Sequence, residues 1–437
     1  MRAVRSALQS TRLRRIVAAY TVNRLGTWFG VIALSLVVFD HTHSAIAVAG
    51  LLFAGQVLPA LVVPALVARV ELSERPGELS ALYLVEAVVT TALAVLLWHF
   101  WLPAVLLLVA LDGSAALTAS ALLRTEAARV AREEVGAGDS MALTSGSATE
   151  SPAEVAERKA NASLNIAFSG TFVLGPALAG EVVGAAGGSA ALFIDAASFL
   201  ICSAMLIDVR PQISEEAEAS VRARLKEAWR HLGSVPALAT LLATEAVALV
   251  FFESGAPIQV AYTKATLQVG DRGYGLLLTV WGVGGIIGSI IFARGVRRSL
   301  GGMLTGGTFA VGLGYIGFAA APSFGVACGA AVIGGIGNGV QWAALISAVQ
   351  QLTPPALHGR IMGGVESIGA FCLALGLSLG AALVALSSPR GAFLAVGAGA
   401  VMTTIVFARL SIRGFAPLPN GSVEPSAEAP VESLETS

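Results

Sequence analysis

The sequence predicts an all-α membrane protein with twelve transmembrane helices arranged as two repeats of six. Three observations lead to this class. Of the 437 residues, 55% are hydrophobic and 13% are charged, whereas a soluble domain usually carries about 25% charged residues. The apolar residues form separate runs of about 20, the length with which a helix crosses about 30 Å of hydrocarbon. Segments of the first half of the chain also recur in the second half.

Twelve apolar runs follow one another along the chain, separated by polar segments. The first run follows the basic start MRAVRSALQSTRLRR. It is too long for the core of a signal peptide, and no small-residue cleavage site ends it, so we expect an uncleaved first helix. In chain order the runs cover residues 16–39, 44–68, 79–101, 103–123, 162–184, 188–208, 236–257, 273–293, 302–321, 324–350, 361–386 and 391–409.

The distribution of positive charge predicts on which side of the membrane the loops lie. An even number of spans places both ends of the chain on one side. Of the 27 Lys and Arg residues, all but Arg24, Lys264, Arg272 and Arg390 fall on that side. Positive charge accumulates in the cytoplasmic loops of membrane proteins. We therefore expect both termini in the cytoplasm and the protein in the cell (cytoplasmic) membrane.

An internal repeat relates the two halves of the chain. The segment GLLFAGQVLPALVVPALVARV from Gly50 matches GLLLTVWGVGGIIGSIIFARG from Gly275, at an offset of 225 residues. Further on, LGPALAGEVV from Leu174 matches LGLSLGAALV from Leu375, at an offset of 201 residues. The spans therefore form two copies of six, and the shorter second offset places an insertion in the first copy.

The repeat and the polar segments together predict two bundles of six helices. Residues 125–160 between spans four and five form the insertion, and their Gly-, Ser- and Thr-rich middle indicates a flexible cytoplasmic loop. The segment between the halves combines helix formers with mixed charge, as an amphipathic helix on the membrane surface does. We expect a cytoplasmic N-terminus at 1–15, a first bundle at 16–209, a cytoplasmic linker at 210–235, a second bundle at 236–412 and a disordered tail at 413–437.

Two parallel repeats of six spans, joined by a polar linker, are the architecture of the major facilitator fold. The chain resembles this superfamily, and within it the drug and siderophore exporters of the macrolide-efflux and enterobactin-exporter type. The resemblance rests on residues 160–200 with the segment FIDAASF, on 273–289, and on 350–371. It implies a substrate site between the halves near mid-membrane and an alternating-access mechanism. The loop after span two departs from the superfamily pattern, because ERPGEL ends in Glu78 and Leu79 where basic residues are usual.

The fifth span contains residues that ordinarily disrupt helices. Its segment GPALAG resembles the antiporter motif Gly-Pro-x-x-Gly-Gly, and Gly170 precedes it. Gly175 and Gly180 would let another helix approach closely, and Pro176 would let the helix bend. We interpret this span as a gating helix, and the resemblance favours export. Close packing without a role in gating is the alternative.

Three charged residues fall deep within predicted spans, where charges are costly and often functional. They are Arg24 on span one, Asp112 on span four and Glu245 on span seven. We hypothesise that Arg24 pairs with one of the two acids and that one acid carries the coupled proton. A static ion pair that only locks the helices together is the alternative.

Further polar and aromatic residues complete the candidate site. Asn23, Gln56, Asn338 and Gln341 are expected to line a cavity, and Trp342 and Trp281 are candidates for its apolar surface. Glu86 and Glu366 lie closer to the cytoplasmic ends of their spans. They are candidate gate residues, with a snorkelling or interhelix hydrogen bond as the alternative.

The remaining motifs argue against other classes of function. No Walker-type Gly-x-x-x-x-Gly-Lys-Ser/Thr segment occurs, so we expect neither an enzyme nor direct drive by ATP. The spacing of Cys202, Cys328 and Cys372 suggests no metal site, and no cofactor or nucleic-acid partner is expected. We predict a monomeric secondary transporter that exports amphiphilic small molecules in exchange for protons. The alternatives are an uptake symporter for a nutrient or siderophore, and a non-transporting sensor or scaffold with this fold.

Overall fold

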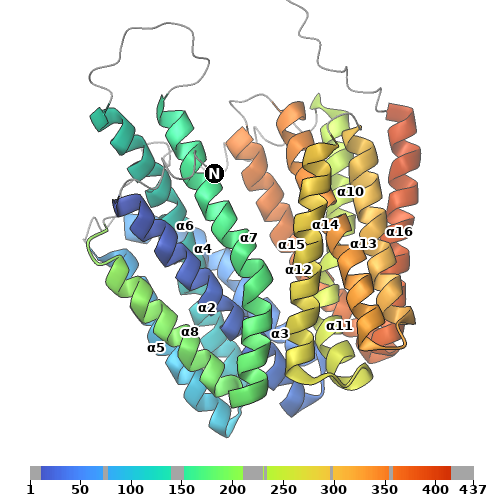
Figure 1. The fold of residues 1–437 in the computed structure, drawn as a ribbon, viewed down its shortest axis with the longest axis horizontal. Helices are drawn as coiled ribbons and strands as arrows, with labels where there is room; N and C mark the ends of the chain where they lie inside the picture. The colour runs from blue at the N-terminus through green and yellow to red at the C-terminus, as the bar shows by residue number, and fades with distance from the viewer. Residues whose placement is uncertain are drawn as a thin grey trace, which may run out of the picture.

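The computed structural model describes residues 11–71, 77–138, 152–209, 230, 234–295, 299–353 and 358–414. Within these ranges the chain is helical and contains no strand. Twelve of its segments are long and apolar enough to cross a membrane, as the sequence predicts. They form two groups of six that stand side by side, blue to green and yellow to red in Figure 1.

The first six spans make up the N-terminal half. The second span is one continuous rod in which a π-helical turn, η1, joins two α-helices. The elements are α2 (Thr11–Thr42), α3 (Ala45–Leu52), η1 (Phe53–Val57), α4 (Leu58–Glu71), α5 (Glu78–Leu96), η2 (Leu97–His99), α6 (Leu102–Gly138), α7 (Pro152–Ala186) and α8 (Gly188–Met205).

The second six spans make up the C-terminal half. Its first span also contains a π-helical turn, η4, which follows one long and one short α-helix. The elements are α10 (Pro236–Glu253), α11 (Gly255–Ala261), η4 (Tyr262–Thr266), α12 (Gly270–Arg294), α13 (Leu300–Ala320), α14 (Phe324–Leu352), α15 (His358–Leu386) and α16 (Pro389–Gly414).

Local sequence signals set several helix ends. The side chain of Ser299 accepts a hydrogen bond from the backbone N–H of Gly302 at 3.2 Å, which caps the start of α13. Pro236 occupies the first turn of α10, where its missing N–H is not needed. Gly187 takes a φ of 85° between α7 and α8, a conformation that glycine adopts without strain.

The structure differs from the predicted boundaries at the insertion and at the seventh span. α6 runs on to Gly138 and α7 begins at Pro152, so both flanks of residues 125–160 are helical, and the middle that is predicted as a loop lies outside the described residues. Ala127, Val130 and Ala131 explain the extension of α6, because they are buried against the N-terminal half. The seventh span continues to Thr266 through η4. Most of the linker, the proposed surface helix and the tail beyond Gly414 lie outside the described residues.

The packing differs between the two ends of the bundle. We call the end at which α2 begins the inner side and the opposite end the outer side. On the outer side one apolar cluster contains Phe39 and Val48 of the N-terminal half together with Val260 and Tyr274 of the C-terminal half. On the inner side the clusters of the two halves are separate. The ribbons accordingly meet at one end and diverge at the other (Figure 1).

Candidate functional site

The two halves approach each other closely at a contact of small residues in α7 and α12. A Cβ atom added to Gly180 would lie 2.8 Å from the carbonyl oxygen of Asp271 and 3.0 Å from the Cα of Gly275. A Cβ at Gly275 would collide with the carbonyl oxygen of Pro176. Only glycine therefore fits at both positions, and the two backbones touch near their outer ends.

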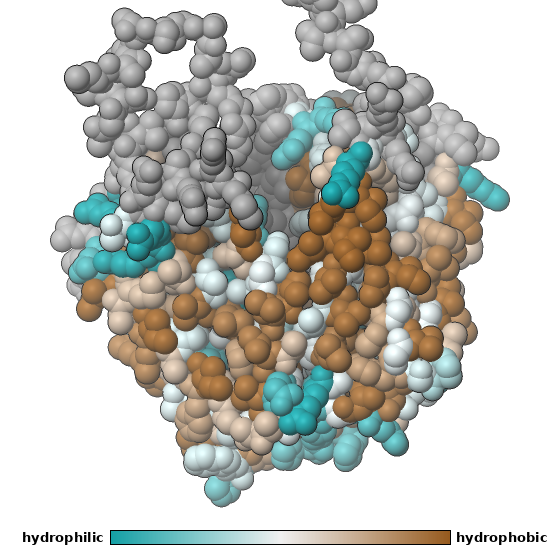
Figure 2. All heavy atoms as spheres, viewed as in Figure 1, coloured by the Kyte–Doolittle hydropathy of each residue, from teal (hydrophilic) through white to brown (hydrophobic). Residues whose placement is uncertain are grey.

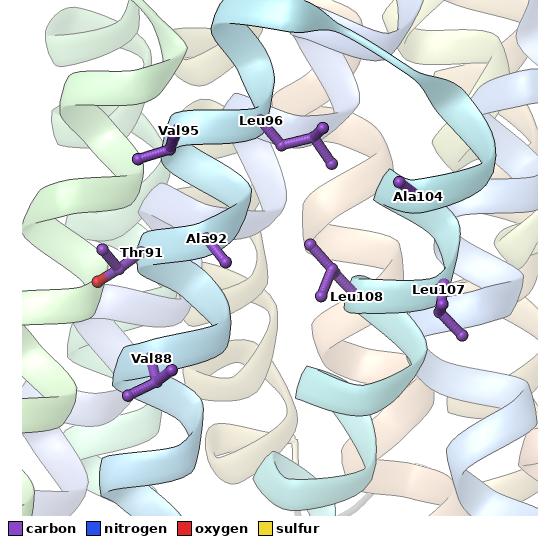
Figure 3. Close-up of a pocket in the computed structure, with 8 residues that line it drawn as sticks. All are labelled: Val88, Thr91, Ala92, Val95, Leu96, Ala104, Leu107 and Leu108. Atoms are coloured by element: carbon purple, nitrogen blue, oxygen red, sulfur yellow. The ribbon is translucent and has the colours of Figure 1, made fainter.

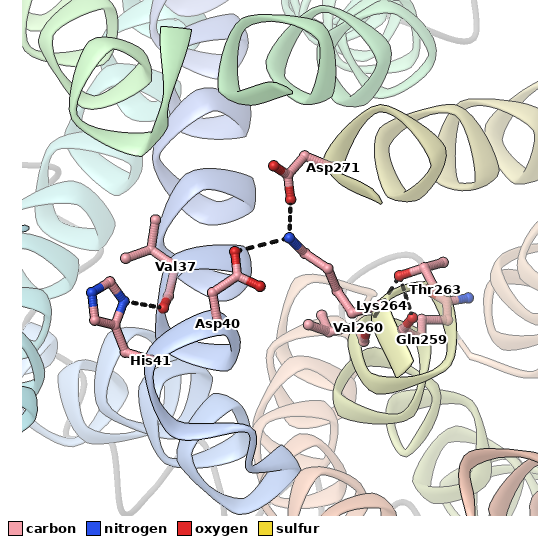
Figure 4. A network of polar contacts seen from close by, with 8 residues as sticks. All are labelled: Val37, Asp40, His41, Gln259, Val260, Thr263, Lys264 and Asp271. Carbon is pink, nitrogen blue, oxygen red and sulfur yellow. Dashed lines mark hydrogen bonds and ion pairs between the residues drawn. The ribbon is translucent and has the colours of Figure 1, made fainter. Parts of the chain in front are cut away.

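A group of ion pairs lies beside this contact on the outer side (Figure 4). Lys264 of η4 bonds to Asp40 of α2 at 2.9 Å across the interface, and also contacts the carboxylate of Asp271 on α12. Glu181 and Arg272 form a second bridge between the halves at 3.0 Å. The Lys264 side chain is only 14% exposed, so water screens its two ion pairs incompletely.

A second line of contact joins α3 to α15 on the outer side. Ala49 packs with Leu377 and Ala381 in a small apolar cluster. Along the α7–α12 contact, the hydroxyl of Thr279 on α12 donates to the carbonyl of Val173 on α7 at 2.9 Å. Apolar contacts, hydrogen bonds and ion pairs thus close the outer side together.

The inner side is open between the halves. Figure 2 shows the surface hollowed there, between the α7 side and the α12 side of the molecule. Trp342 on α14, a candidate for the apolar surface of the site, is 56% exposed. Trp281 was expected to form part of the apolar surface of the cavity. It is instead buried and stacks on Tyr315, with ring centroids 5.5 Å apart.

Arg24 does not form the ion pair that the sequence suggested. Its guanidinium lies over the ring of Phe168, 4.9 Å from the centroid, and its Nε is buried without a hydrogen-bond partner. Asp112 instead accepts a hydrogen bond from Thr90 at 3.0 Å. Glu245 accepts one from Gln341 at 2.8 Å, within the C-terminal half. Position along a helix gave the depth of these groups but not the direction in which they point.

The neutral polar residues that were expected to line a cavity differ in burial, from buried against a neighbouring helix to exposed. Asn23 is buried and donates to the hydroxyl of Tyr83 at 3.0 Å, so it holds α2 against α5. Gln56 is exposed on the π-helical turn η1, a type of turn that is frequent at functional sites. Asn338 is half-buried on α14, one turn before Gln341.

The structure bears differently on the two candidate gate residues, Glu86 and Glu366. Glu86 is fully buried inside the N-terminal half, and neither carboxylate oxygen has a hydrogen-bond partner. The titratable groups that act on it are Asp112 and Asp195, so it faces other acids inside the half and does not line an inner gate. Glu366 lies on α15, and its side chain is outside the described part of the chain.

The glycines of α7 also differ among themselves. Gly175 packs against Trp28 of α2, where a Cβ atom would collide with the indole ring. A Cβ at Gly170 would meet nothing within 4 Å. Close packing therefore involves Gly175 and Gly180, and Gly170 has no such contact.

The ion pairs of the outer side were not expected from the sequence. A signal for them was present, because Lys264 and Arg272 are two of only three basic residues assigned to that side. Acids lie at the ends of the neighbouring spans, at Asp40 and Glu181. Basic residues so rare on one face of a membrane protein are natural candidates for pairing.

An apolar groove lies away from the interface, between α5 and α6 (Figure 3). Its one polar side chain, Thr91, already donates its hydroxyl to the carbonyl of Ala87 at 2.7 Å. The groove thus offers no free polar group to orient a solute, and we do not assign it to the site. It is lined by Val88, Thr91, Ala92, Val95, Leu96, Ala104, Leu107 and Leu108.

Comparison with known proteins identifies the fold. No protein-family model matches the chain, and no curated relative matches it in sequence. Among solved structures, the nucleoside transporter NupG is similar at 12% identity and a TM-score of 0.69, over 92% of this chain and 99% of that chain. A bacterial homologue of the iron transporter ferroportin, in an inward-facing state, is similar at 15% identity and a TM-score of 0.66, over 92% and 100%.

A third similar structure is a bacterial homologue of the human lysosomal transporter Spinster, inward-facing and occupied. It is 12% identical, with a TM-score of 0.66, over 92% of this chain and 96% of that chain. These likenesses span nearly the whole chain, and together with the twelve apolar helices they show the major facilitator fold.

Proposed function

We propose that the protein is a secondary active transporter that works by alternating access, with its site between the two halves. The observation that carries this proposal is the asymmetry of the interface. The outer side is closed by the α7–α12 contact and by two sets of ion pairs, whereas on the inner side the apolar clusters of the two halves are separate and the surface is hollowed between them (Figure 2). Such an arrangement fits one end state of a pair of rocking bundles.

The contacts on the outer side suit a reversible gate. The ion pairs of Lys264 and Arg272 join the halves by side chains alone, so the halves can separate without unfolding a helix. At the glycine contact between α7 and α12 no side chains interlock, so the two helices can change their crossing angle there. Pro176, within α7, removes one helical hydrogen bond next to that contact. We propose α7 as the gating helix.

The similar solved structures support transport as the class of function. They include a nucleoside transporter, a POT family transporter in complex with a thioalcohol conjugated peptide, a homologue of the iron transporter ferroportin and a homologue of the lysosomal transporter Spinster. These cargoes share no chemistry, so the fold supports the mechanism and not the substrate. We propose export of an amphiphilic small molecule of the drug or siderophore type, by a monomer in the cytoplasmic membrane with both termini in the cytoplasm.

Protons are our proposed coupling ion. Asp112 and Glu245 each hold a carboxyl group within the membrane, and among the described residues each has one neutral hydrogen-bond partner and no ion pair. A carboxylate without a cationic partner is costly in hydrocarbon, and a carboxyl group that gains and loses a proton as water reaches it avoids that cost. The proposal needs no metal and no cofactor, and no nucleic-acid partner enters it.

Proton flux in liposomes tests this function. The protein is reconstituted with an internal pH-sensitive dye, a pH gradient is imposed, and aromatic acids, lipophilic cations, macrolides and catecholate siderophores are added in turn. We expect at least one class to collapse the gradient faster than empty liposomes do. Glu245→Gln and Asp112→Asn should suppress the cargo-dependent part, because an amide cannot carry the proton.

Asp208→Asn is the matched control, since Asp208 is an exposed acid paired with Arg15 at 3.6 Å. It should leave the flux unchanged. Cargo movement that continues undiminished in both acid variants would contradict proton coupling. Absence of movement for every class, in protein shown to be folded, would contradict transport itself.

A further inference from the structure

Two arginines of the N-terminal half lie within electrostatic range of each other, and among the described residues neither has a carboxylate partner. Arg24 on α2 interacts with the ring of Phe168 and forms no ion pair with a described residue. Arg124 on α6 donates to the hydroxyl of Tyr20 at 3.1 Å and lies over that ring, 5.7 Å from its centroid. Tyr20 and Arg24 are one turn apart on α2, so they share a face of that helix. Arg124 is thereby brought within electrostatic range of Arg24.

Such a pair is unfavourable when nothing else is bound. Two like charges in range of each other repel, and a charge within the membrane-spanning part is costly without a partner. Other described arginines show the usual solution. Arg15, Arg129 and Arg272 each pair with a carboxylate. The charged and titratable groups that act most on Arg24 are Tyr20 and Arg124, and no carboxylate is among them.

Aromatic rings continue from Arg24 along the face between α2 and α7. Phe168 lies 6.0 Å from Phe172, and Phe172 lies 5.3 Å from Trp28 in an edge-to-face arrangement. Phe168 is partly exposed next to the guanidinium. A charged group at Arg24 would therefore have apolar, polarisable surface directly beside it, which suits a flat organic body.

We infer that the site takes an organic anion, whose acidic group is held by Arg24 and Arg124 and whose aromatic or apolar body lies along Phe168. The inference rests on the proposed function, because it names the substrate class of the same site. The fork of a guanidinium donates two parallel hydrogen bonds to a carboxylate, sulfonate or phosphate. Binding would satisfy the unpartnered Nε of Arg24 and relieve the repulsion between the two arginines.

A pair of fluorescent probes with one aromatic body tests the charge preference. Dansylglycine carries a carboxylate and dansylcadaverine carries an ammonium group on the same dansyl ring. Each is titrated into the full-length protein in nanodiscs of zwitterionic lipid, and the emission from empty nanodiscs is subtracted. We expect saturable binding of dansylglycine and none of dansylcadaverine over the same concentration range.

Variants of the two arginines locate the binding. Arg24→Gln should weaken dansylglycine binding by about tenfold or more, the usual effect of losing a hydrogen bond to a charged group. Arg124→Gln should weaken it by a smaller factor, and Arg24→Lys should retain part of the affinity. Arg24→Glu should reverse the preference and favour dansylcadaverine. Arg15→Gln, on the same helix but at an exposed ion pair, is the control and should bind as the wild type does.

The outcomes separate this inference from the proposed function. Preference for dansylcadaverine, no saturable binding of dansylglycine, or equal binding to Arg24→Gln would overturn the substrate class. Loss of dansylglycine binding in nanodiscs that contain phosphatidylglycerol would show that lipid headgroups fill the arginine pair, and would also overturn it. Arginine-dependent dansylglycine binding with no flux in liposomes would instead leave the inference standing and refute transport.

Discussion

Removing the amino group of Lys264 should shift the protein away from the state with a closed outer side. Lys264 contacts Asp40 and Asp271 together, so Lys264→Gln removes two ion pairs and leaves two carboxylates facing each other. A fully exposed pair contributes about 0–1 kcal/mol. Lys264 is largely buried, so its ion pairs contribute more than a fully exposed pair does. Asp40 is 47% exposed, so solvent still screens part of that free energy.

We therefore expect the substitution to cost the closed outer side about 1–3 kcal/mol. That free energy corresponds to a change of about 5- to 150-fold in the ratio of the two states. A state present at about 1% would then become readily detectable. A second substitution at Asp271 should partly reverse the shift, because Asp271→Asn removes one of the two repelling carboxylates.

The assay is a distance measurement between spin labels across the outer side. Labels at His43→Cys and Ser388→Cys sit on exposed positions of opposite halves, in a background without the native cysteines. We expect one short distance for the wild type and an added longer distance for Lys264→Gln. Arg15→Gln, which removes an exposed ion pair of the inner side, should give the wild-type distribution. An unchanged distribution in Lys264→Gln, with the fold intact, would refute the reasoning.

The remaining predictions concern packing and buried polar groups. Gly275→Leu should separate α7 from α12, since even a Cβ atom collides there. Cargo flux in this variant should fall at least tenfold. Gly170→Leu, at a position where a Cβ atom meets nothing, is the control and should transport normally. Gln341→Leu should leave Glu245 without its partner and lower the free energy of unfolding by about 1–2 kcal/mol, measured as a lower melting temperature in detergent; an unchanged temperature would contradict this. Glu86→Met should hold or raise the melting temperature, because it replaces a buried, unpartnered carboxyl group by an apolar side chain of similar volume; a clear drop would show that Glu86 has a partner in the working protein.

The fold could be predicted because the bilayer restricts the choices. Within hydrocarbon the backbone must satisfy its own hydrogen bonds, so runs of about 20 apolar residues become helices. The internal repeat then divides them into two bundles. The boundaries were less accurate where the sequence carries no sharp signal. The extension of α6 to Gly138 depends on Ala127 and Val130 finding a surface to pack on, and the π-helical turn η4 has no recognisable sequence pattern.

The candidate site could be predicted only as a set of residues, not as an arrangement. The rise of a helix predicts the depth of a side chain, and Arg24, Asp112 and Glu245 lie on helices long and apolar enough to cross a membrane. Whether two of them meet depends on how the helices are rotated and tilted against their neighbours, which a single sequence does not encode locally. The rotation of the helices places Arg24 against Phe168 and Asp112 against Thr90, and so the two do not pair with each other.

The most direct test of alternating access is a reversible link across the outer side. Glu181 and Arg272 bridge the halves at 3.0 Å and are both exposed, so Glu181→Cys and Arg272→Cys can be joined by a bifunctional thiol reagent that a reductant cleaves. Cargo-dependent flux in liposomes is measured before linking, after linking and after reduction. The account predicts flux that stops with the link and returns with the reductant. Flux that continues while the halves are joined would contradict it.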